Sequence, residues 1–257
     1  MKYTIVLRED KYSANVGKQI RQRLNFNGWI FDEKYPDLVI CVGGDGTMLR
    51  AIHMYMEQLD TLQFVGIHTG TLGFFTDYTY GELENFLNDV TKNESVIESF
   101  PLLEIQLPET NQSFYSFNEI RIDGMGKTIH LMIYIDGEFF ESTAGSGICI
   151  STQCGSTGAN RALSGAVVDS GLQILQLCEI MPISHHNHST LRNPYIMRVD
   201  RKIDIKITSS NPVYAIYDHL SRELKNITQI HIEASAKKVR FARYRTYSYL
   251  TRLRNLY

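Results

Sequence analysis

Short apolar runs alternate with helix-spaced apolar residues over the first hundred positions. Residues 3–7 (YTIVL), 38–42 (LVICV) and 64–67 (FVGI) are continuous β-prone runs, as expected of strands covered on both faces. Elsewhere apolar residues recur every three or four positions, which predicts amphipathic helices. These sets are Val16, Ile20 and Leu24; Met48, Leu49, Ile52 and Met56; and Leu83, Phe86, Leu87 and Val90. The alternation predicts a doubly wound α/β domain over residues 1–100.

After Pro101 the pattern changes to strict alternation of apolar and polar residues. Residues 103–107 (LEIQL), 203–207 (IDIKI) and 227–232 alternate, as does much of 129–139. Within that last stretch, Asp136-Gly137 is a hairpin-turn signal. We expect one helical segment around residues 170–178. The prediction is a β-rich second domain over residues 101–240.

Composition excludes several classes of protein. The 257 residues are 43% hydrophobic and 21% charged, with a formal net charge of −2, which gives no global attraction to nucleic acid or membrane. Cys41, Cys149, Cys154 and Cys178 show neither metal-ligand spacing nor a disulfide framework. No signal-peptide pattern or membrane-spanning run is present. We expect a reduced, cytoplasmic protein that binds neither nucleic acid nor membrane.

The sharpest local signal is a glycine-rich turn between the run 38–42 and the helix that follows. Residues 43–47 read GGDGT, and such a turn lets the backbone approach a phosphate while N–H groups at the helix start bind it. It is neither a Walker A loop nor G-x-G-x-x-G. Asp45 in its centre suits two tasks: accepting a proton from an attacking hydroxyl, or holding Mg²⁺ against phosphates. The alternative is an aspartate that caps the helix.

With this turn the chain resembles the NAD kinase family. Diacylglycerol and sphingosine kinases share GGDGT, so other segments discriminate. Residues 67–74 (IHTGTLGF), 118–119 (NE), 145–157 (GSGICISTQCGST), 218–221 (DHLS) and 239–243 (VRFAR) are similar to further family segments in the same order. Thr71 stands where His is usual. The resemblance is collinear over nearly the whole chain, which makes it specific.

The resemblance implies a kinase that phosphorylates the 2′-hydroxyl of the adenosine ribose of NAD, using ATP, or polyphosphate, with Mg²⁺ or another divalent cation. It also implies a homotetramer, an ATP-binding first domain, an NAD-binding second domain, and a tail of about 241–257 that returns to the first. Asp45 is the implied catalytic residue, and no residue is implied as a protein-held metal ligand. The implied substrate-binding residues are Gly44, Gly46, Thr47, Phe74, Asn118, Glu119, Ser146, Cys154, Thr157, Gly158, Ala162 and Asp218.

The residue types suit these roles. Asn118 offers an amide donor and acceptor to an adenine edge, and Glu119 can accept hydrogen bonds from ribose hydroxyls. Taken alone, an Asn-Glu pair more often just ends a strand. The binding role of Asn118 and Glu119 is therefore inferred from the resemblance to the family along the whole chain. The neighbouring His185, His186 and His188 have no carboxylate or Cys arranged beside them in the sequence, and we expect no metal site there.

The expected NAD pocket departs from the family pattern. Ala144 and Ser146 replace the Arg and Asp of an Arg-Gly-Asp-Gly run, Gln153 replaces a Pro, Gly158-Ala159 replaces Ala-Tyr, and Met181 replaces a small residue. These changes remove charged side chains and an aromatic ring, whereas the glycine-rich turn at residues 43–47 is intact. Two rival hypotheses therefore remain. One is a catalytically weakened NAD(P)-binding regulatory protein, and the other is a lipid kinase, which the polar segments disfavour.

Overall fold

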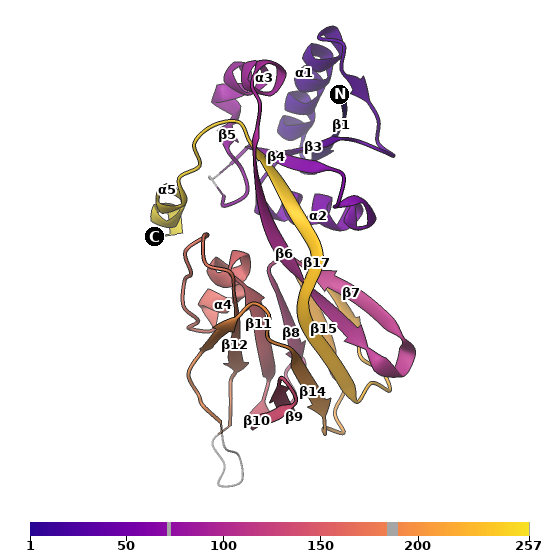
Figure 1. Ribbon diagram of the computed structural model, residues 1–257, viewed down its shortest axis with the longest axis vertical. Coiled ribbons are helices and arrows are strands. Elements are labelled where there is room, and N and C mark those ends of the chain that lie inside the picture. The colour runs from indigo at the N-terminus through magenta and orange to yellow at the C-terminus, as the bar shows by residue number, and fades with distance from the viewer. Residues whose placement is uncertain (71–72, 184–189, 257) are drawn as a thin grey trace. The chain divides into compact units, whose positions relative to one another are not determined.

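The computed structural model describes residues 1–70, 73–183 and 190–256. The chain divides into two compact units: Met1–Phe100 together with the segment from Lys237 onward, and Pro101–Ala236 (Figure 1). The long strands β6 (Val96–Leu107) and β17 (Gln229–Arg243) each contribute residues to both units. No described helix has the length and apolar character needed to cross a membrane.

The first unit is built on parallel strands in the order β2-β1-β3-β4, with β5 beside β4. The strands are β1 (Lys2–Leu7), β2 (Ile30–Phe31), β3 (Leu38–Val42), β4 (Gln63–His68) and β5 (Tyr78–Thr79). The helices are α1 (Lys11–Phe26), α2 (Asp45–Met54) and α3 (Leu83–Lys92), with short 3-10 turns η1 (Met56–Gln58) and η2 (Tyr80–Glu82). Figure 1 shows α1 and α3 on one side of these strands and α2 on the other. The predicted doubly wound α/β architecture is confirmed.

Helices α1 and α3 form where the helix-spaced residues predict them. Asp10 caps α1 by accepting a hydrogen bond from the Ser13 N–H at 2.8 Å, which satisfies an orphan donor of the first turn. The buried residues of both helices share one core with alternate residues of β3 and β4, among them Leu38, Ile40 and Val65. The strands present their other residues to the opposite face, as the pleat requires.

The second unit consists of two sheets around one apolar core. The first contains β10 (Glu138–Gly145), β9 (Ile129–Ile135), β14 (Ile203–Ile207) and β17 in that order, followed by β6 and β7 (Gln112–Ser116). The second sheet is antiparallel, in the order β13 (Tyr195–Arg198), β12 (Ile174–Ile180), β11 (Gly147–Thr152), β8 (Glu119–Asp123), β15 (Tyr214–Tyr217) and β16 (Leu220–Glu223). Between strands lie η3 (Pro108–Thr110), η4 (Cys154–Thr157) and α4 (Ala159–Ala162). The predicted β-rich character is confirmed.

The prediction of a helix around residues 170–178 is wrong, because most of that stretch belongs to strand β12. This strand pairs with β11 on one side and β13 on the other, so both edges of its backbone are hydrogen bonded. Leu175 and Leu177 face the core that the two sheets share. A short apolar run fits a helix or a buried strand equally well by period alone, and tertiary pairing decides between them.

The hairpin predicted at Asp136-Gly137 joins β9 to β10. Both residues have positive φ, 52° and 82°, as a two-residue type I′ turn requires. Ile135 pairs with Glu138 directly beside the turn.

The end of β17 is fixed within the first unit by a buried ion pair. Arg243 Nη1 donates to both carboxylate oxygens of Asp77 at 2.9 Å, and its Nε donates to Glu98 at 2.9 Å. The Arg243 residue is 6% exposed and Asp77 is 4% exposed. Helix α5 (Tyr249–Leu253) and turn η5 (Arg254–Leu256) complete the described chain.

Arg243→Met should destabilise the protein by about 3–5 kcal/mol, because it leaves the buried Asp77 charge without its closest compensation. Urea unfolding measures the loss. Arg245→Met is the control: Arg245 pairs with Glu82 at 2.8 Å, but its side chain is 37% exposed, so the loss should stay within about 1 kcal/mol. Equal losses in the two variants would contradict the structural role of Arg243.

Candidate functional site

The glycine turn leads directly into the start of α2. Gly44 is the N-cap, and its carbonyl accepts hydrogen bonds from the N–H groups of Thr47 at 2.9 Å and Met48 at 3.2 Å. Within the described residues, a Cβ added to Gly44 or Gly46 would meet no atom within 4 Å, whereas one added to Gly43 would overlap the Thr47 side chain. The first amides of the helix therefore remain accessible to an anion.

Asp45 is held from outside its own helix. Its Oδ2 accepts a hydrogen bond from the Phe74 N–H at 2.9 Å, and its Oδ1 accepts one from the Phe75 N–H at 3.0 Å. A Cβ on Gly73 would overlap both carboxylate oxygens, so the close approach needs glycine there. The Gly44 cap has no side-chain hydrogen bond. Asp45 therefore does not cap α2.

Burial raises the pKa of the Asp45 carboxyl above its ordinary value, although the amide hydrogen bonds from Phe74 and Phe75 and the charge of Arg252 act in the opposite direction. A raised pKa makes the carboxylate a better proton acceptor. A partly buried, amide-held carboxylate beside accessible helix-start amides can thus bind a phosphate and deprotonate a hydroxyl at the same place.

His68, at the end of β4, lies close enough to influence Asp45 electrostatically. Its Nδ1 lies 2.8 Å from the Gly70 carbonyl oxygen, while its buried Nε2 has no hydrogen-bond partner within the described residues. Thr71, in the same motif, lies outside the described residues, as do His185, His186 and His188.

In the second unit, Asp218 holds the turn that carries Asn118. Its carboxylate accepts hydrogen bonds from the N–H groups of Phe117 at 2.8 Å and Asn118 at 2.7 Å, and from the Ser116 hydroxyl at 2.9 Å. The Asn118 carbonyl in turn accepts from the Thr152 N–H at 2.9 Å. In this geometry Asp218 acts on the backbone around Asn118.

Glu119 follows Asn118 and is 7% exposed. Burial raises the pKa of Glu119 to about 7, the charge of Asp218 adds to the rise, and Arg121 opposes it. Glu119 Oε2 and Asn118 Oδ1 have no hydrogen-bond partner in the part of the chain that the structure describes. Buried polar atoms are normally paired. These two atoms are therefore suited to receive ligand donors.

The loop after β11 covers this pair of residues. A Cβ on Gly158 would lie 3.2 Å from Glu119 Oε2, and one on Gly155 would overlap the Asn118 backbone. The predicted binding residues of this loop are accessible to different degrees: Cys154 and Thr157 are partly buried, whereas Gly158 and Ala162 are exposed. The structure thus brings Asn118, Glu119, the 154–158 turn and Asp218 together.

A buried amide that the sequence analysis missed holds this loop in place. Asn160 Nδ2 donates to the carbonyls of Ser156 and Ala166 at 3.2 Å each, and its Oδ1 accepts from the Cys178 thiol at 3.1 Å. Gln176 on β12 adds bonds of 2.7 and 3.1 Å to the backbone of Ala166. The sequence feature that could have revealed these hydrogen bonds is Gln176, a polar residue inside an apolar strand.

Ser146 lies apart from the Asn118 cluster. Ser151 pairs with Glu119, while Gly147, at the start of β11, pairs with Asp123. Five strand positions separate Ser146 from Ser151, roughly 17 Å. Ser146 instead contacts Met181, with Oγ 3.8 Å from the thioether sulfur, and the Ala144 carbonyl accepts a hydrogen bond from Ile183 at 2.7 Å. Within one chain, the structure does not bring Ser146 to Glu119.

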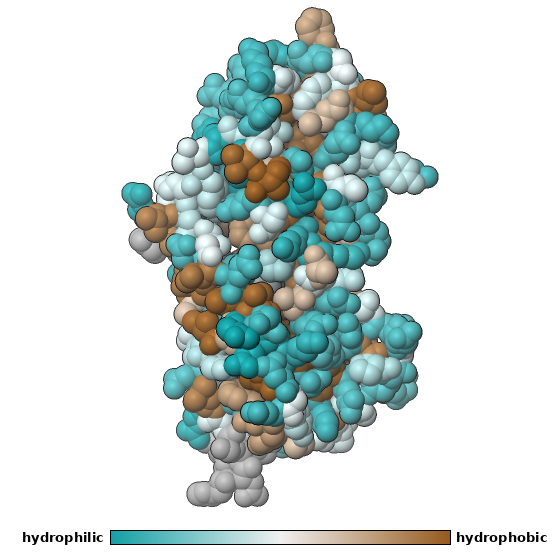
Figure 2. All heavy atoms as spheres, in the orientation of Figure 1, coloured by the Kyte–Doolittle hydropathy of each residue, from teal (hydrophilic) through white to brown (hydrophobic). Residues whose placement is uncertain are grey.

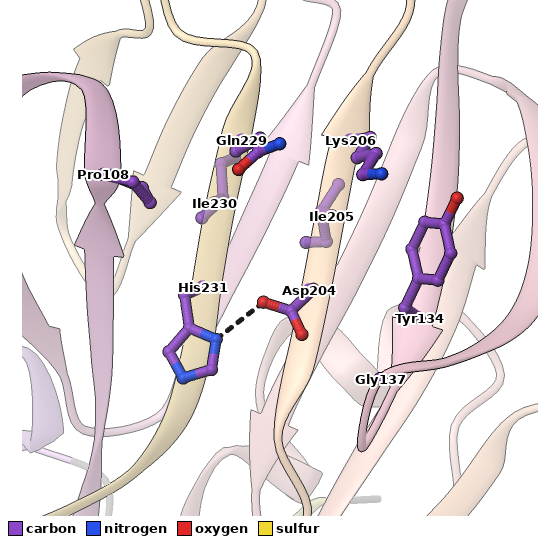
Figure 3. Close-up of a pocket in the computed structure, with 9 residues that line it drawn as sticks. All are labelled: Pro108, Tyr134, Gly137, Asp204, Ile205, Lys206, Gln229, Ile230 and His231. Atoms are coloured by element: carbon purple, nitrogen blue, oxygen red, sulfur yellow. Dashed lines mark hydrogen bonds and ion pairs between the residues drawn. The ribbon is translucent and has the colours of Figure 1, made fainter.

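A further pocket, of about 310 Å³, lies on the sheet face formed by β9, β14 and β17 (Figure 3). Its lining consists of Pro108, Tyr134, Gly137, Asp204, Ile205, Lys206, Gln229, Ile230 and His231. His231 Nδ1 lies 2.7 Å from an Asp204 oxygen, and Lys206 Nζ lies 4.9 Å from the Tyr134 ring centroid. Its charged groups have partners on the protein itself, and we assign it no substrate.

Comparison with known proteins agrees with this geometry. The family model described as ATP-NAD kinase N-terminal domain matches residues 13–95, and the ATP-NAD kinase C-terminal domain matches residues 118–244. NAD kinase 1 of Bacillus cereus (strain ZK / E33L) is 34% identical over 99% of this chain and 98% of its own length. The NAD kinase of Leuconostoc mesenteroides is 35% identical over 100% and 98%.

Solved structures share the fold. An NAD kinase from Archaeoglobus fulgidus, crystallised with ATP, superposes with a TM-score of 0.78 at 24% identity, covering 100% of this chain and 97% of that one. A yeast NADH kinase complexed with NADH gives 0.84 at 19% identity, covering 100% and 86%. With both family models spanning most of the chain and relatives matching end to end, this chain belongs to the NAD kinase family.

Proposed function

We propose that this protein is an ATP-dependent NAD kinase that phosphorylates the 2′-hydroxyl of the adenosine ribose of NAD and forms NADP. The observation that carries the proposal is the setting of Asp45. Two backbone amides hold its carboxylate at the start of α2, beside accessible helix-start N–H groups. Family membership supports NAD as the acceptor and ATP as the donor. It does not favour the lipid kinase or the inactive regulatory protein.

In this mechanism Asp45 accepts the proton of the 2′-hydroxyl. The hydroxyl oxygen attacks the γ-phosphorus of ATP, the bond from that phosphorus to the β–γ bridging oxygen breaks, and ADP leaves. Proton transfer accompanies formation of the new bond, because a sugar hydroxyl is far less acidic than a carboxyl group. The amides at the start of α2, including that of Gly46, bind phosphate oxygens and stabilise their charge.

The second unit supplies the residues that bind the nucleoside. Asn118 Oδ1 accepts from the adenine amino group, and Glu119 Oε2 accepts from a ribose hydroxyl. Both atoms are buried without partners in the described part of the chain, and an unpaired buried polar atom costs free energy that a ligand donor restores. Asp218 keeps Asn118 in place through the backbone.

A divalent cation fits this site as part of the ATP complex. Mg²⁺ is commonly bound by substrate phosphates and water with few protein ligands. Bound there, it neutralises phosphate charge during transfer. No described atom lies within 4 Å of a Cβ built on Gly44 or Gly46, so the described part of the site leaves room for hydrated phosphates.

We also propose a homotetramer that works in the cytoplasm. On the face shown in Figure 2, apolar residues gather around α4 and β12 of the second unit. Leu172, Met181 and Ile183, on segments flanking β12, are 57%, 78% and 49% exposed. Exposed apolar groups of this kind favour burial against another subunit. The structure has no disulfide among the four cysteines, all of which lie in its described residues, and this suits a reducing compartment. Sedimentation equilibrium measures the assembly directly.

Asp45→Asn should lower kcat by about 10²–10⁴-fold, the usual effect of losing a general base. The fold should persist, because the isosteric amide still accepts one of the two backbone hydrogen bonds. NADP formation from NAD, ATP and Mg²⁺ is the assay. Asp60→Asn, which changes an exposed carboxylate of the same unit, is the control and should keep normal turnover. Near-normal turnover in Asp45→Asn would remove Asp45 from the mechanism.

Glu119→Gln should stabilise the protein at alkaline pH. The pKa of Glu119 rises from 4.5 to about 7 on folding, so the folded state binds its proton more tightly than the unfolded state. The contribution of Glu119 to the free energy of unfolding is fully present below pH 4.5. It is lost as pH rises through about 7, by up to about 3 kcal/mol.

The glutamine variant lacks this loss, so its advantage in urea midpoint over the wild type should be larger at pH 8 than at pH 5. Glu223→Gln, which removes an exposed carboxylate on β16, controls for the loss of one charge. An advantage that does not change with pH would show that Glu119 is not strained by burial.

Ala159→Tyr should lower KM for NAD by about 2- to 10-fold, because an aromatic contact contributes about 0.5–1.5 kcal/mol beyond its buried area. Ala159 follows Gly158, which lies against Glu119, so the ring would stand beside the proposed nucleoside site. Ala159→Leu adds apolar volume without a ring and should gain less. An unchanged KM in the tyrosine variant would place NAD elsewhere.

A further inference from the structure

The segment that holds Asp45 is itself held by the C-terminal tail. The Tyr247 hydroxyl donates to the Phe74 carbonyl at 2.9 Å. Arg252 Nη2 donates to the Thr76 carbonyl at 2.9 Å and lies 3.3 Å from Asp77 Oδ1. Arg252 is 6% exposed, so these bonds are shielded from water. Residues 74–77 are therefore fixed by the tail on the side opposite to Asp45's bonds.

Tyr247 is itself fixed by its neighbours. The guanidinium carbons of Arg243 and Arg252 lie 4.2 and 4.1 Å from the centroid of its ring, in the range of cation–π attraction. Burial raises the pKa of Tyr247, so its hydroxyl stays protonated as a donor. Tyr249 adds a ring contact with Phe74 at 5.6 Å between centroids.

One peptide group connects Tyr247 to Asp45. The carbonyl of Phe74 accepts the Tyr247 hydroxyl, and the N–H of the same peptide group, that of Phe75, donates to Asp45 Oδ1 at 3.0 Å. A hydrogen bond to an amide oxygen polarises the amide and strengthens its N–H as a donor. The tail thus acts on the carboxylate through a continuous chain of hydrogen bonds.

We propose that Tyr247 and Arg252 are positioning residues for the phosphoryl transfer, which orient the Asp45 carboxylate through the backbone of residues 74–76. The proposal rests on the proposed role of Asp45 as the proton acceptor. It gives the tail a task in the chemical step in addition to its packing. Neither tail residue touches the reacting atoms in this scheme, so their loss should reduce kcat and leave substrate binding unchanged.

The test is Tyr247→Phe, which keeps the ring between the two guanidinium groups and removes only the hydroxyl. We expect kcat to fall by about 3- to 10-fold, the effect of one hydrogen bond, with KM for NAD and ATP unchanged. Tyr244→Phe is the matched control: it removes a hydroxyl of the same tail that lies beside the Ser95 side chain, whereas the Phe74 carbonyl accepts from Tyr247. It should leave kcat at the wild-type value.

A double-mutant cycle separates positioning from general structural support. In an Asp45→Asn background, Tyr247→Phe should have no further effect on the residual turnover, because its influence passes through the Asp45 carboxylate. Arg252→Lys, which keeps the charge but loses the forked donors, should follow the same pattern and serves if Tyr247→Phe folds poorly.

Each outcome has one meaning. Unchanged kcat in folded Tyr247→Phe, an equal loss in Tyr244→Phe, or additive losses with Asp45→Asn would overturn the positioning role while the kinase assignment stands. Wild-type enzyme that makes no NADP from NAD and ATP would instead overturn the proposed function.

Discussion

The first unit is organised around the need to keep a carboxylate charged beside the turn that we propose binds phosphate. Desolvation raises the pKa of Asp45, and an anion placed near polyphosphate is repelled unless fixed dipoles offset both effects. The amides of Phe74 and Phe75 supply those dipoles. They reach the carboxylate only because position 73 has no side chain. The glycine at 73 is thus as necessary to the site as the glycines of the turn.

The second unit also buries a carboxylate, but its surroundings differ from those of Asp45. Glu119 is buried with an oxygen that no described residue satisfies, and its pKa rises to about 7. No backbone amide of the described residues offsets the burial of that oxygen, and this burial carries an energetic penalty. A site that binds through unpaired polar atoms gains specificity, since a ligand lacking the matching donors leaves them unpaired. Asp45 is stabilised in advance by the fold, whereas the nucleoside that we propose binds here would stabilise Glu119.

Much of the fold could be predicted because, in most strands and helices, the spacing of apolar residues along the sequence matches the residues that are buried. The α/β alternation of the first hundred residues and the Asp136 hairpin follow directly from sequence pattern. The helix expected at residues 170–178 failed because pairing with β11 and β13 overrode an ambiguous apolar run. The backbone role of Asp218 and the tail contact of Tyr247 span about a hundred or more positions, and no local pattern contains such contacts.

The departures from the family pattern fall at two separate places, and this separation limits what they affect. Ala144, Ser146 and Met181 gather at one end of β11, whereas Gly158 lies against Glu119 at the other. The backbone amides that hold the Asp45 carboxylate do not depend on side-chain identity at those positions. The machinery proposed for proton acceptance therefore remains complete while residues implied in nucleotide binding vary. If these residues bind NAD as we propose, such substitutions should change how tightly NAD is held more than how fast bound NAD reacts.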